Sequence, residues 1–278
     1  MQAIIQAIAQ QAARANAPET GDYRGADGLL YCGKCHTPKQ CLVTVFGRIM
    51  KVPCMCQCRT EADEQQKAAD AAQYARRQIR DRGGIASAYR FDAADMTQEM
   101  EKCRRYAERW EEARQENIGL LLWGGVGTGK TFAAHCICNA LIDQEEPVSV
   151  FATSLSRVLN SGFDKTEVIE RVRRTPLVVF DDLGAERGSD YALEIVFMLV
   201  DERYRAKKPM IVTSNVTMDE MKKPKIKLPN GAEIPDIRRK RIYDRVLEMC
   251  VPVYFAGGSK RLDIAADKKA SMQKFLED

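Results

Sequence analysis

The sequence has no long apolar run, no strong net charge and no internal repeat. Its longest uninterrupted apolar stretches, 120–123 and 177–180, are far shorter than the roughly 20 residues of a membrane span. No basic residue precedes Arg14, and glutamines interrupt the apolar positions before it, which is unlike a signal peptide. We therefore expect a cytoplasmic protein that makes no membrane contact.

The net charge is only +4, which is too small to predict a nucleic-acid partner by itself. The chain has ten cysteines, and six of them lie between residues 32 and 58. In a reducing compartment, thiols clustered in this way indicate a metal site more than a disulfide framework.

The composition changes along the chain and predicts four parts. Residues 1–20 should contain a short helix, because Ile4, Ile5 and Ile8 fall at helical spacing before Pro18. This helix could pack on its own protein or present its isoleucines to a partner. Residues 21–60 hold the clustered cysteines, 61–90 form a charged helical linker, and 91–278 form the largest domain.

The second part predicts a small zinc-ribbon-like module. Two alternating runs, 41–46 and 49–53, flank a glycine turn and suggest a hairpin with cysteines at both ends. Cys32 and Cys35 form a C-x-x-C knuckle, and 18 residues separate Cys35 from the next cysteine group. Free buried thiols and a redox pair are the alternatives to structural zinc. Two further zinc ligands are expected among Cys54, Cys56 and Cys58, with His36 and Cys41 as additional candidates.

The largest domain alternates short apolar runs with amphipathic stretches, which predicts a parallel sheet covered on both faces by helices. The expected strands are 119–123, 148–151, 177–180, 210–214 and 251–255. The expected helices are 131–143, 165–173, 191–205 and 238–250, and a linker helix is expected over 61–82, before a glycine pair.

A glycine-rich loop follows the first of these strands. Residues 124–131 read GGVGTGKT and match the pattern G-x-x-x-x-G-K-[ST] between a strand and a helix. Such a loop wraps its backbone N–H groups around phosphates, and the helix N-terminus adds its dipole. We expect ATP to be bound through Gly125, Val126, Gly127, Thr128, Gly129, Lys130 and Thr131.

Acidic and amide side chains follow two other strands. Asp181 and Asp182 end the run 177–180, and Asp181 is the expected carboxylate ligand of Mg²⁺ together with the Thr131 hydroxyl. Asp182 could orient or deprotonate the attacking water, or merely cap the next segment. Asn215 follows the strand 210–214 and could hydrogen-bond a water or the γ-phosphate. No N-K-x-D motif is present, which argues against a GTPase.

These motifs together resemble the AAA+ ATPases, and more narrowly the bacterial and phage helicase loaders of the DnaC/DnaI type. The resemblance covers most of residues 30–262. It implies an α/β AAA+ P-loop NTPase core with a five-stranded parallel sheet and no sizeable lid domain. It also implies that Asn215 is sensor 1, that Arg245 or else Arg241 is an arginine finger acting on a neighbouring subunit, and that Arg261 occupies the sensor 2 position.

Two positions depart from the family's pattern. Lys260 stands where an aromatic residue is common, and only 17 residues follow Arg261, too few for a helical lid. Asp182 is also shorter than the more usual glutamate, so hydrolysis is expected to be slow or stimulated by a partner or DNA.

A basic region favours contact with DNA. Between Arg203 and Arg245 there are 13 basic and five acidic residues. The stretch 222–231 carries four lysines, and we expect it to be a flexible loop that neutralises phosphates or simply solvates the subunit. The resemblance implies that the chain contacts single-stranded DNA without sequence specificity.

The sequence thus favours a loader that assembles with itself and places a replicative DnaB-type helicase on single-stranded DNA, with ATP, Mg²⁺ and Zn²⁺ as cofactors. The N-terminal cysteine-rich part is then assigned to gripping the helicase. Two alternatives stay open. One is an IstB-like ATPase that assists a transposase, and the other is an adaptor that binds ATP with little hydrolysis.

Overall fold

A computed structural model describes residues 18–45, 47–160, 165–185, 190–227 and 231–260, together with residues 269, 272 and 275. The chain divides into two compact units, Met1–Ala75 and Arg76–Asp278, which we describe separately. The helix expected within residues 1–20 falls almost entirely outside the described residues, and so does Arg261.

The first unit contains two small antiparallel hairpins. Strands β1 (Tyr23–Arg24) and β2 (Leu30–Tyr31) form one, which was not predicted. Strands β3 (Gln40–Val45) and β4 (Arg48–Pro53) form the other, which the sequence predicts. Both faces of the β3–β4 hairpin expose large apolar side chains, so little core supports this unit. Hairpins of this size are marginal in water without another constraint.

Helix α2 (Gln57–Gly83) contains the boundary between the two units. It begins four residues before the expected position and ends at the expected glycine pair, where Gly84 adopts a φ of +70°. A left-handed residue at this position is the ordinary way to end a helix, and glycine adopts it without strain.

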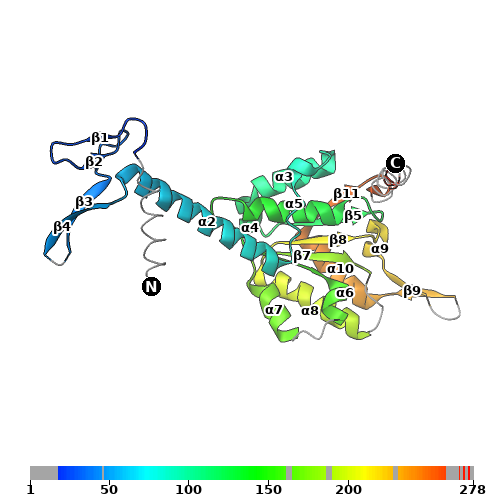
Figure 1. Ribbon diagram of the computed structural model, residues 1–278. Helices are drawn as coiled ribbons and strands as arrows, with labels where there is room; N and C mark the ends of the chain where they lie inside the picture. The colour runs from blue at the N-terminus through cyan, green and yellow to red at the C-terminus, as the bar shows by residue number, and fades with distance from the viewer. Residues whose placement is uncertain are drawn as a thin grey trace. The chain divides into compact units, whose positions relative to one another are not determined.

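The second unit is built on a five-stranded parallel sheet in the order β11-β5-β8-β7-β6 (Figure 1). The prediction of a five-stranded α/β core is therefore confirmed. The β6 strand begins two residues later than expected. The strands are β5 (Gly119–Gly124), β6 (Val150–Ser154), β7 (Leu177–Leu183), β8 (Met210–Ser214) and β11 (Cys250–Phe255).

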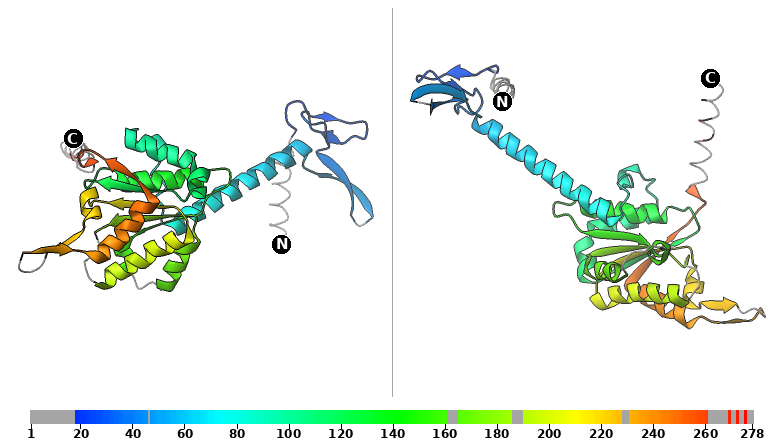
Figure 2. Two further views of the ribbon diagram at one scale, coloured as in Figure 1. Left: turned by 180° about the vertical axis from the view of Figure 1, so that it is seen from behind. Right: turned by 60° about the horizontal axis from the view of Figure 1, so that its bottom comes forward.

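Helices cover both faces of this sheet, as Figures 1 and 2 show. Helix α5 (Lys130–Ile142) and helix α3 (Gln98–Glu108) lie on one face, followed by the short α4 (Trp110–Gln115). The other face carries α6 (Leu155–Asn160), α7 (Lys165–Arg174), α8 (Asp190–Ala206) and α10 (Ile237–Met249).

Alternate strand residues supply the two cores. Leu120 and Leu122 of β5 pack on the α3–α5 side, whereas Leu121 between them packs on the α8–α10 side. All three are at most 5% exposed. A strand buried on both faces in this way reads as a continuous apolar run, which is why the sequence reveals it.

Several elements were not predicted. Helix α3 places Met100, Cys103 and Tyr106 in the core, although charged residues fill most of its other positions. The lysine-rich stretch 222–231 is not simply the flexible loop we expected. It includes the end of α9 (Met218–Lys222) and strand β9 (Lys225–Lys227), which pairs with β10 (Glu233–Pro235). The short 3-10 helix η1 (Phe91–Ala93) was not predicted either.

No helix in the described part of the chain is both long enough and apolar enough to cross a membrane.

Candidate functional site

The glycine-rich loop leaves the carboxyl end of β5 and leads directly into α5, as the motif predicts. Gly127 and Gly129 have φ values of +82° and +100°, a region that other residues adopt only with strain. A side chain at Gly127 would also lie 2.1 Å from the Ser259 hydroxyl. The turn therefore requires glycine, and its backbone amides precede a helix N-terminus, where anions bind.

The Lys130 side chain hydrogen-bonds the backbone of this loop. Its side chain is buried, and its Nζ donates to the carbonyl oxygens of Gly124 at 3.0 Å and Gly125 at 2.5 Å. A buried ammonium next to a helix N-terminus favours an anion there, because phosphate oxygens would offset its desolvation.

The Asp181 carboxylate on β7 connects β8 and the start of α5 through hydrogen bonds. Oδ1 of Asp181, near the end of β7, accepts hydrogen bonds from the Thr131 hydroxyl at 2.9 Å and from the Thr213 hydroxyl at 2.7 Å. Hydroxyl and carboxylate oxygens are the ligands that Mg²⁺ prefers, so this donor set fits the ion. Thr131 and Asp181 are the residues that could hold it.

The other predicted catalytic residues occupy different positions. Asp182 is half-buried next to Asp181 and adopts a φ of +59°. Asn215 follows β8 and is exposed at the same edge of the sheet. Parallel strands present their carboxyl ends at one edge, so both residues lie on the side of the sheet where the loop begins.

The two predicted finger arginines lie on α10 and stack on the same ring. The guanidinium carbon of Arg241 lies 4.4 Å from the Phe197 ring centroid, and that of Arg245 lies 4.5 Å from it. Arg245 also forms an ion pair with Asp201 at 2.9 Å, and its side chain is 25% exposed. Arg241 is exposed. The structure thus gives Arg245 a partner within its own chain.

The loop after α2 is fastened to α5. Nδ2 of Asn139 donates to the carbonyl oxygens of Ala86 at 2.9 Å and Tyr89 at 2.7 Å, and Nδ1 of His135 accepts from the Ala86 amide at 3.0 Å. Burial lowers the pKa of His135, and the charge of Asp181 acts in the opposite direction without reversing the shift. The Tyr89 ring packs on that of Phe132 with centroids 5.0 Å apart. Sequence reasoning missed His135 and Asn139, since nothing in the motifs points to them.

A segment after β11 approaches the glycine-rich loop from the C-terminal side. The amide of Lys260 donates to the Gly127 carbonyl at 3.0 Å, and its Nζ lies 3.1 Å from Asp95. Lys260, which departs from the family's pattern, therefore contacts both the glycine-rich loop and the segment that contains Asp95.

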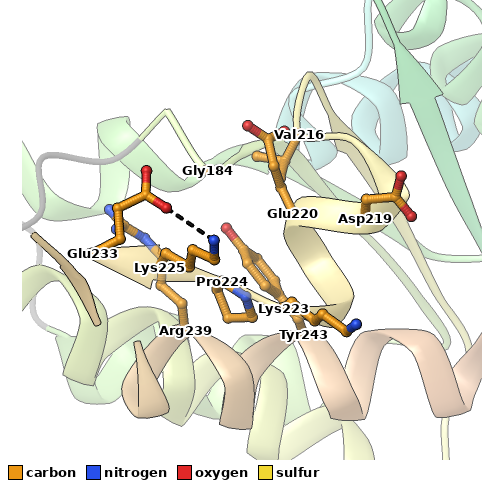
Figure 3. A pocket seen from close by; sticks show the side chains of 10 residues that line it. All are labelled: Gly184, Val216, Asp219, Glu220, Lys223, Pro224, Lys225, Glu233, Arg239 and Tyr243. Atoms are coloured by element: carbon orange, nitrogen blue, oxygen red, sulfur yellow. Dashed lines mark hydrogen bonds and ion pairs between the residues drawn. The ribbon is translucent and has the colours of Figure 1, made fainter. Parts of the chain in front are cut away.

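A pocket of about 630 Å³ lies beside the carboxyl ends of β7 and β8 (Figure 3). It carries charges of both signs, and the Lys225–Glu233 ion pair crosses part of it. Its walls come from the loop after β7, from α9, from the β9–β10 hairpin and from α10. The residues that line it are Gly184, Val216, Asp219, Glu220, Lys223, Pro224, Lys225, Glu233, Arg239 and Tyr243.

In the first unit, four of the six clustered cysteines come together. The sulfur atoms of Cys32, Cys35, Cys56 and Cys58 all lie within 4.8 Å of one another. Two of the separations are 3.7 Å (Cys32 to Cys58) and 3.4 Å (Cys56 to Cys58). A tetrahedral zinc site with Zn–S bonds of about 2.3 Å needs sulfurs about 3.8 Å apart, so this donor set fits zinc.

The remaining candidate ligands lie outside this cluster. The Cys54 thiol donates to the Pro38 carbonyl at 3.5 Å, and Nδ1 of His36 contacts the Tyr23 hydroxyl at 3.3 Å. Within the cluster, hydrogen bonds from the Thr37 hydroxyl and from backbone amides lower the pKa of Cys35 to about 5. Neighbouring sulfurs raise the pKa of Cys58 to about 12.

Comparison with known proteins places this site in context. Residues 89–267 match the family described as "IstB-like ATP binding protein". The "Replicative helicase loader DnaI" of Bacillus subtilis (strain 168) is 30% identical over 148 residues, which cover 51% of this chain and 47% of that protein. The "Replicative helicase loader DnaC" of Escherichia coli (strain K12) is 28% identical over 142 residues, covering 49% and 56%.

The chain therefore spans about half the length of the curated relatives it matches. A solved structure described as "Crystal Structure of the DnaI" aligns with a TM-score of 0.49 and 22% identity, covering 65% of this chain and 94% of that one. The relatives' names agree with the resemblance that the motifs predict, which is confirmed.

Proposed function

Because the chain belongs to the IstB-like ATP-binding protein family, we propose that it is an ATPase that binds a DnaB-type replicative helicase and places it on single-stranded DNA. The observation that carries the ATPase part is the meeting of the Thr131 hydroxyl and the Asp181 carboxylate at 2.9 Å, next to a buried Lys130. The loader part is supported by the two relatives named as helicase loaders.

The chain's own residues would act on ATP as follows. Residues 125–131 would bind the phosphates, with Lys130 exchanging its two carbonyl acceptors for phosphate oxygens. Thr131 and Asp181 would hold Mg²⁺, which neutralises phosphate charge when bound. Asp182 would orient the attacking water, and Asn215 would hydrogen-bond that water or the γ-phosphate. Because aspartate is short, we expect slow turnover that rises with partner or DNA.

Self-assembly would complete the site. An arginine supplied by a neighbouring subunit adds positive charge only after two subunits meet, which couples hydrolysis to assembly. Arg245 and Arg241 are the candidates on α10, with Arg261 as the sensor 2 residue. Since Arg245 is ion-paired with Asp201, it would have to leave this partner to act on another subunit.

The cysteine-rich unit would bind Zn²⁺ through Cys32, Cys35, Cys56 and Cys58 and grip the helicase with the hairpins that the metal stabilises. A closed set of four thiolates leaves no position for substrate, so the site would be structural. The basic region from Arg203 to Arg245 would contact single-stranded DNA. Several of its cations are already paired with carboxylates, including Arg238, Arg239 and Lys240, so Lys222 and Lys223 are the more available contacts.

A co-elution experiment tests this function. The full chain is mixed with the replicative helicase of its own host, with and without a non-hydrolysable ATP analogue, and analysed by size-exclusion chromatography with light scattering. We expect a defined complex whose formation on single-stranded DNA requires ATP and is lost in Lys130→Ala. A chain that ignores the helicase under every nucleotide condition would exclude the loader role.

The family description supports a second candidate, an IstB-like ATPase that assists a transposase. The cysteine-rich unit favours the loader, because a transposase regulator has no need of a helicase-gripping module. Recovery of a transposase instead of a helicase from the native host would reverse this choice. A third candidate is an adaptor that binds ATP with little hydrolysis. Measuring ATP turnover that DNA stimulates and that Asp182→Ala abolishes would exclude this candidate.

A further inference from the structure

Thr213 occupies an irregular place in the parallel sheet. It is fully buried on β8, and on one side it pairs regularly with Leu122 of β5. On the other side, the pairing with β7 breaks between Phe180 and Leu183. Both aspartates fall in this break, opposite Thr213 alone, because Val212 pairs with Phe180 and Ser214 pairs with Leu183. Such a bulge re-aims side chains and is common next to active sites.

The Thr213 hydroxyl contacts both aspartates. It donates to Oδ1 of Asp181 at 2.7 Å and accepts from the backbone amide of Asp182 at 2.9 Å. These roles are fixed by chemistry, since an ionised carboxylate only accepts and an amide N–H only donates. A hydroxyl has one proton and two lone pairs, so the single proton of Thr213 is committed to Asp181.

The second of these bonds supports a strained conformation. Asp182 has a φ of +59°, which is uncommon outside glycine and costs conformational free energy. A hydrogen bond from its own amide to a fully buried hydroxyl stabilises this conformation, and it fixes the direction in which the Asp182 side chain leaves the strand. The first bond holds the Asp181 carboxylate beside the Thr131 hydroxyl.

We propose that Thr213 is a positioning residue that aligns Asp181 and Asp182 together through its one hydroxyl group. The inference rests on the proposed ATPase function and deepens it. A threonine that served only the core would satisfy its hydroxyl on nearby backbone, as Thr175 does by donating to the Arg171 carbonyl at 2.7 Å. The Thr213 hydroxyl instead forms its two hydrogen bonds with Asp181 and Asp182.

Two substitutions separate the hydroxyl from the shape of the side chain. Thr213→Val keeps the branched shape that suits a buried strand and removes the hydroxyl, whereas Thr213→Ser keeps the hydroxyl and removes a methyl group. Thr175→Val is the matched control, because it removes a bonded hydroxyl just before the opposite end of β7. Thermal unfolding of each variant shows whether it is folded.

The readouts are the ATP dissociation constant with and without Mg²⁺, measured by calorimetry, and the kcat and KM of hydrolysis. For Thr213→Val we expect unchanged ATP affinity without Mg²⁺, a roughly 10-fold smaller gain in affinity on adding Mg²⁺, and a kcat lowered about 10- to 100-fold. Thr213→Ser should stay within about 3-fold of wild type in both measurements, and Thr175→Val should match wild type.

The proposal is overturned if Thr213→Val keeps both the Mg²⁺ effect and kcat, or if Thr213→Ser loses as much as Thr213→Val, which would indicate packing alone. If Thr213→Val does not fold, the pair Thr213→Ala and Thr213→Ser makes the same comparison, since only serine retains the hydroxyl. Failure of the proposed function is distinguishable, because the wild-type chain itself would then bind no ATP.

Discussion

Nε of Arg80 on α2 donates a 2.8 Å hydrogen bond to Oδ1 of Asn139 on α5. Asn139 in turn donates to the loop carbonyls of Ala86 and Tyr89, and Asp143, the residue that follows α5, pairs with both Arg80 and Arg90. The end of α2 and the loop after it are therefore fastened to the helix that begins at Lys130. These contacts lie near the end of that helix opposite to Lys130.

The first prediction concerns Asp143→Asn. Burial alone would raise the pKa of Asp143, but the hydrogen bonds from Arg90 and Arg80 outweigh burial and lower it. A carboxyl with a lowered pKa stabilises the fold above its unfolded pKa, near 3.8, and this stability is lost as the pH falls through the folded value. We expect the substitution to cost about 1–2 kcal/mol at pH 7 and to have less effect at pH 3.

Urea unfolding at both pH values, followed by tryptophan fluorescence, measures this difference, because Trp110 and Trp123 both lie in the second unit. Asp244→Asn is the control, since the pair of Asp244 with Lys240 is exposed and its loss should change stability by less than about 1 kcal/mol. An equal loss at pH 7 and pH 3 would contradict the assignment of this stability to the Asp143 carboxylate.

The second prediction concerns zinc in the first unit. Cys58 lies within the cluster of four sulfurs, whereas Cys54 bonds the Pro38 carbonyl outside it. We expect wild type and Cys54→Ser to carry one zinc per chain and Cys58→Ser to lose it, together with the structure of the β3–β4 hairpin. Elemental analysis and circular dichroism measure the two effects. Retention of zinc by Cys58→Ser with loss in Cys54→Ser would reverse the ligand assignment.

The zinc ligands could be predicted only in part from the sequence. The spacing of Cys54, Cys56 and Cys58 permits any two of them as ligands, and only the path of the chain after β4 separates them. The parallel sheet, by contrast, was predictable, because strands buried on both faces are apolar throughout. The glycine-rich loop was predictable because its chemistry requires particular residues at fixed spacing.

The contacts of Thr213 with the acidic pair could not be predicted. They depend on a register shift between β7 and β8, and no local pattern in the sequence encodes such a shift. Helix α3 was missed for a different reason, since few of its residues are apolar. The β9–β10 hairpin was missed because its lysines and prolines read as a loop.

The third prediction tests the proposal that Arg245, or else Arg241, acts on a neighbouring subunit. Lys130→Ala disables a chain's own site but leaves its arginines intact, and Arg245→Ala does the opposite. If Arg245 acts on a neighbour, a 1:1 mixture of these inactive variants should regain ATPase activity, because about a quarter of randomly formed interfaces join an intact site to an intact arginine. The same mixture made with Arg241→Ala tests the alternative.

The ion pair between Arg245 and Asp201 adds a second readout. Because this partner is partly buried, Arg245→Ala should lower the free energy of unfolding by about 1 kcal/mol or more, whereas the exposed Arg241 should matter less. A destabilised Arg245→Ala whose mixture with Lys130→Ala stays inactive would mean that Arg245 serves its own fold. Recovery in the Arg241→Ala mixture would then identify Arg241 as the finger.

The fourth prediction concerns single-stranded DNA. Lys222 and Lys223 are exposed at the end of α9, before the β9–β10 hairpin. If both contact phosphates, the double variant Lys222→Ala/Lys223→Ala should weaken binding and reduce the slope of log affinity against log salt by about 1.4, since each single-strand contact contributes about 0.7. Fluorescence anisotropy with a labelled oligonucleotide between 50 and about 200 mM salt gives this slope.

Lys208→Ala is the control, because Nζ of Lys208 donates to the carbonyl oxygens of Arg173 and Arg174 near the opposite end of the sheet. It removes one positive charge from the same basic region and should leave the salt slope unchanged. An equal effect per lysine at Lys208 would mean that overall charge, not this surface, attracts DNA. Weaker binding at an unchanged slope would place the two lysines outside the phosphate contacts, since releasing fewer counterions must lower the slope.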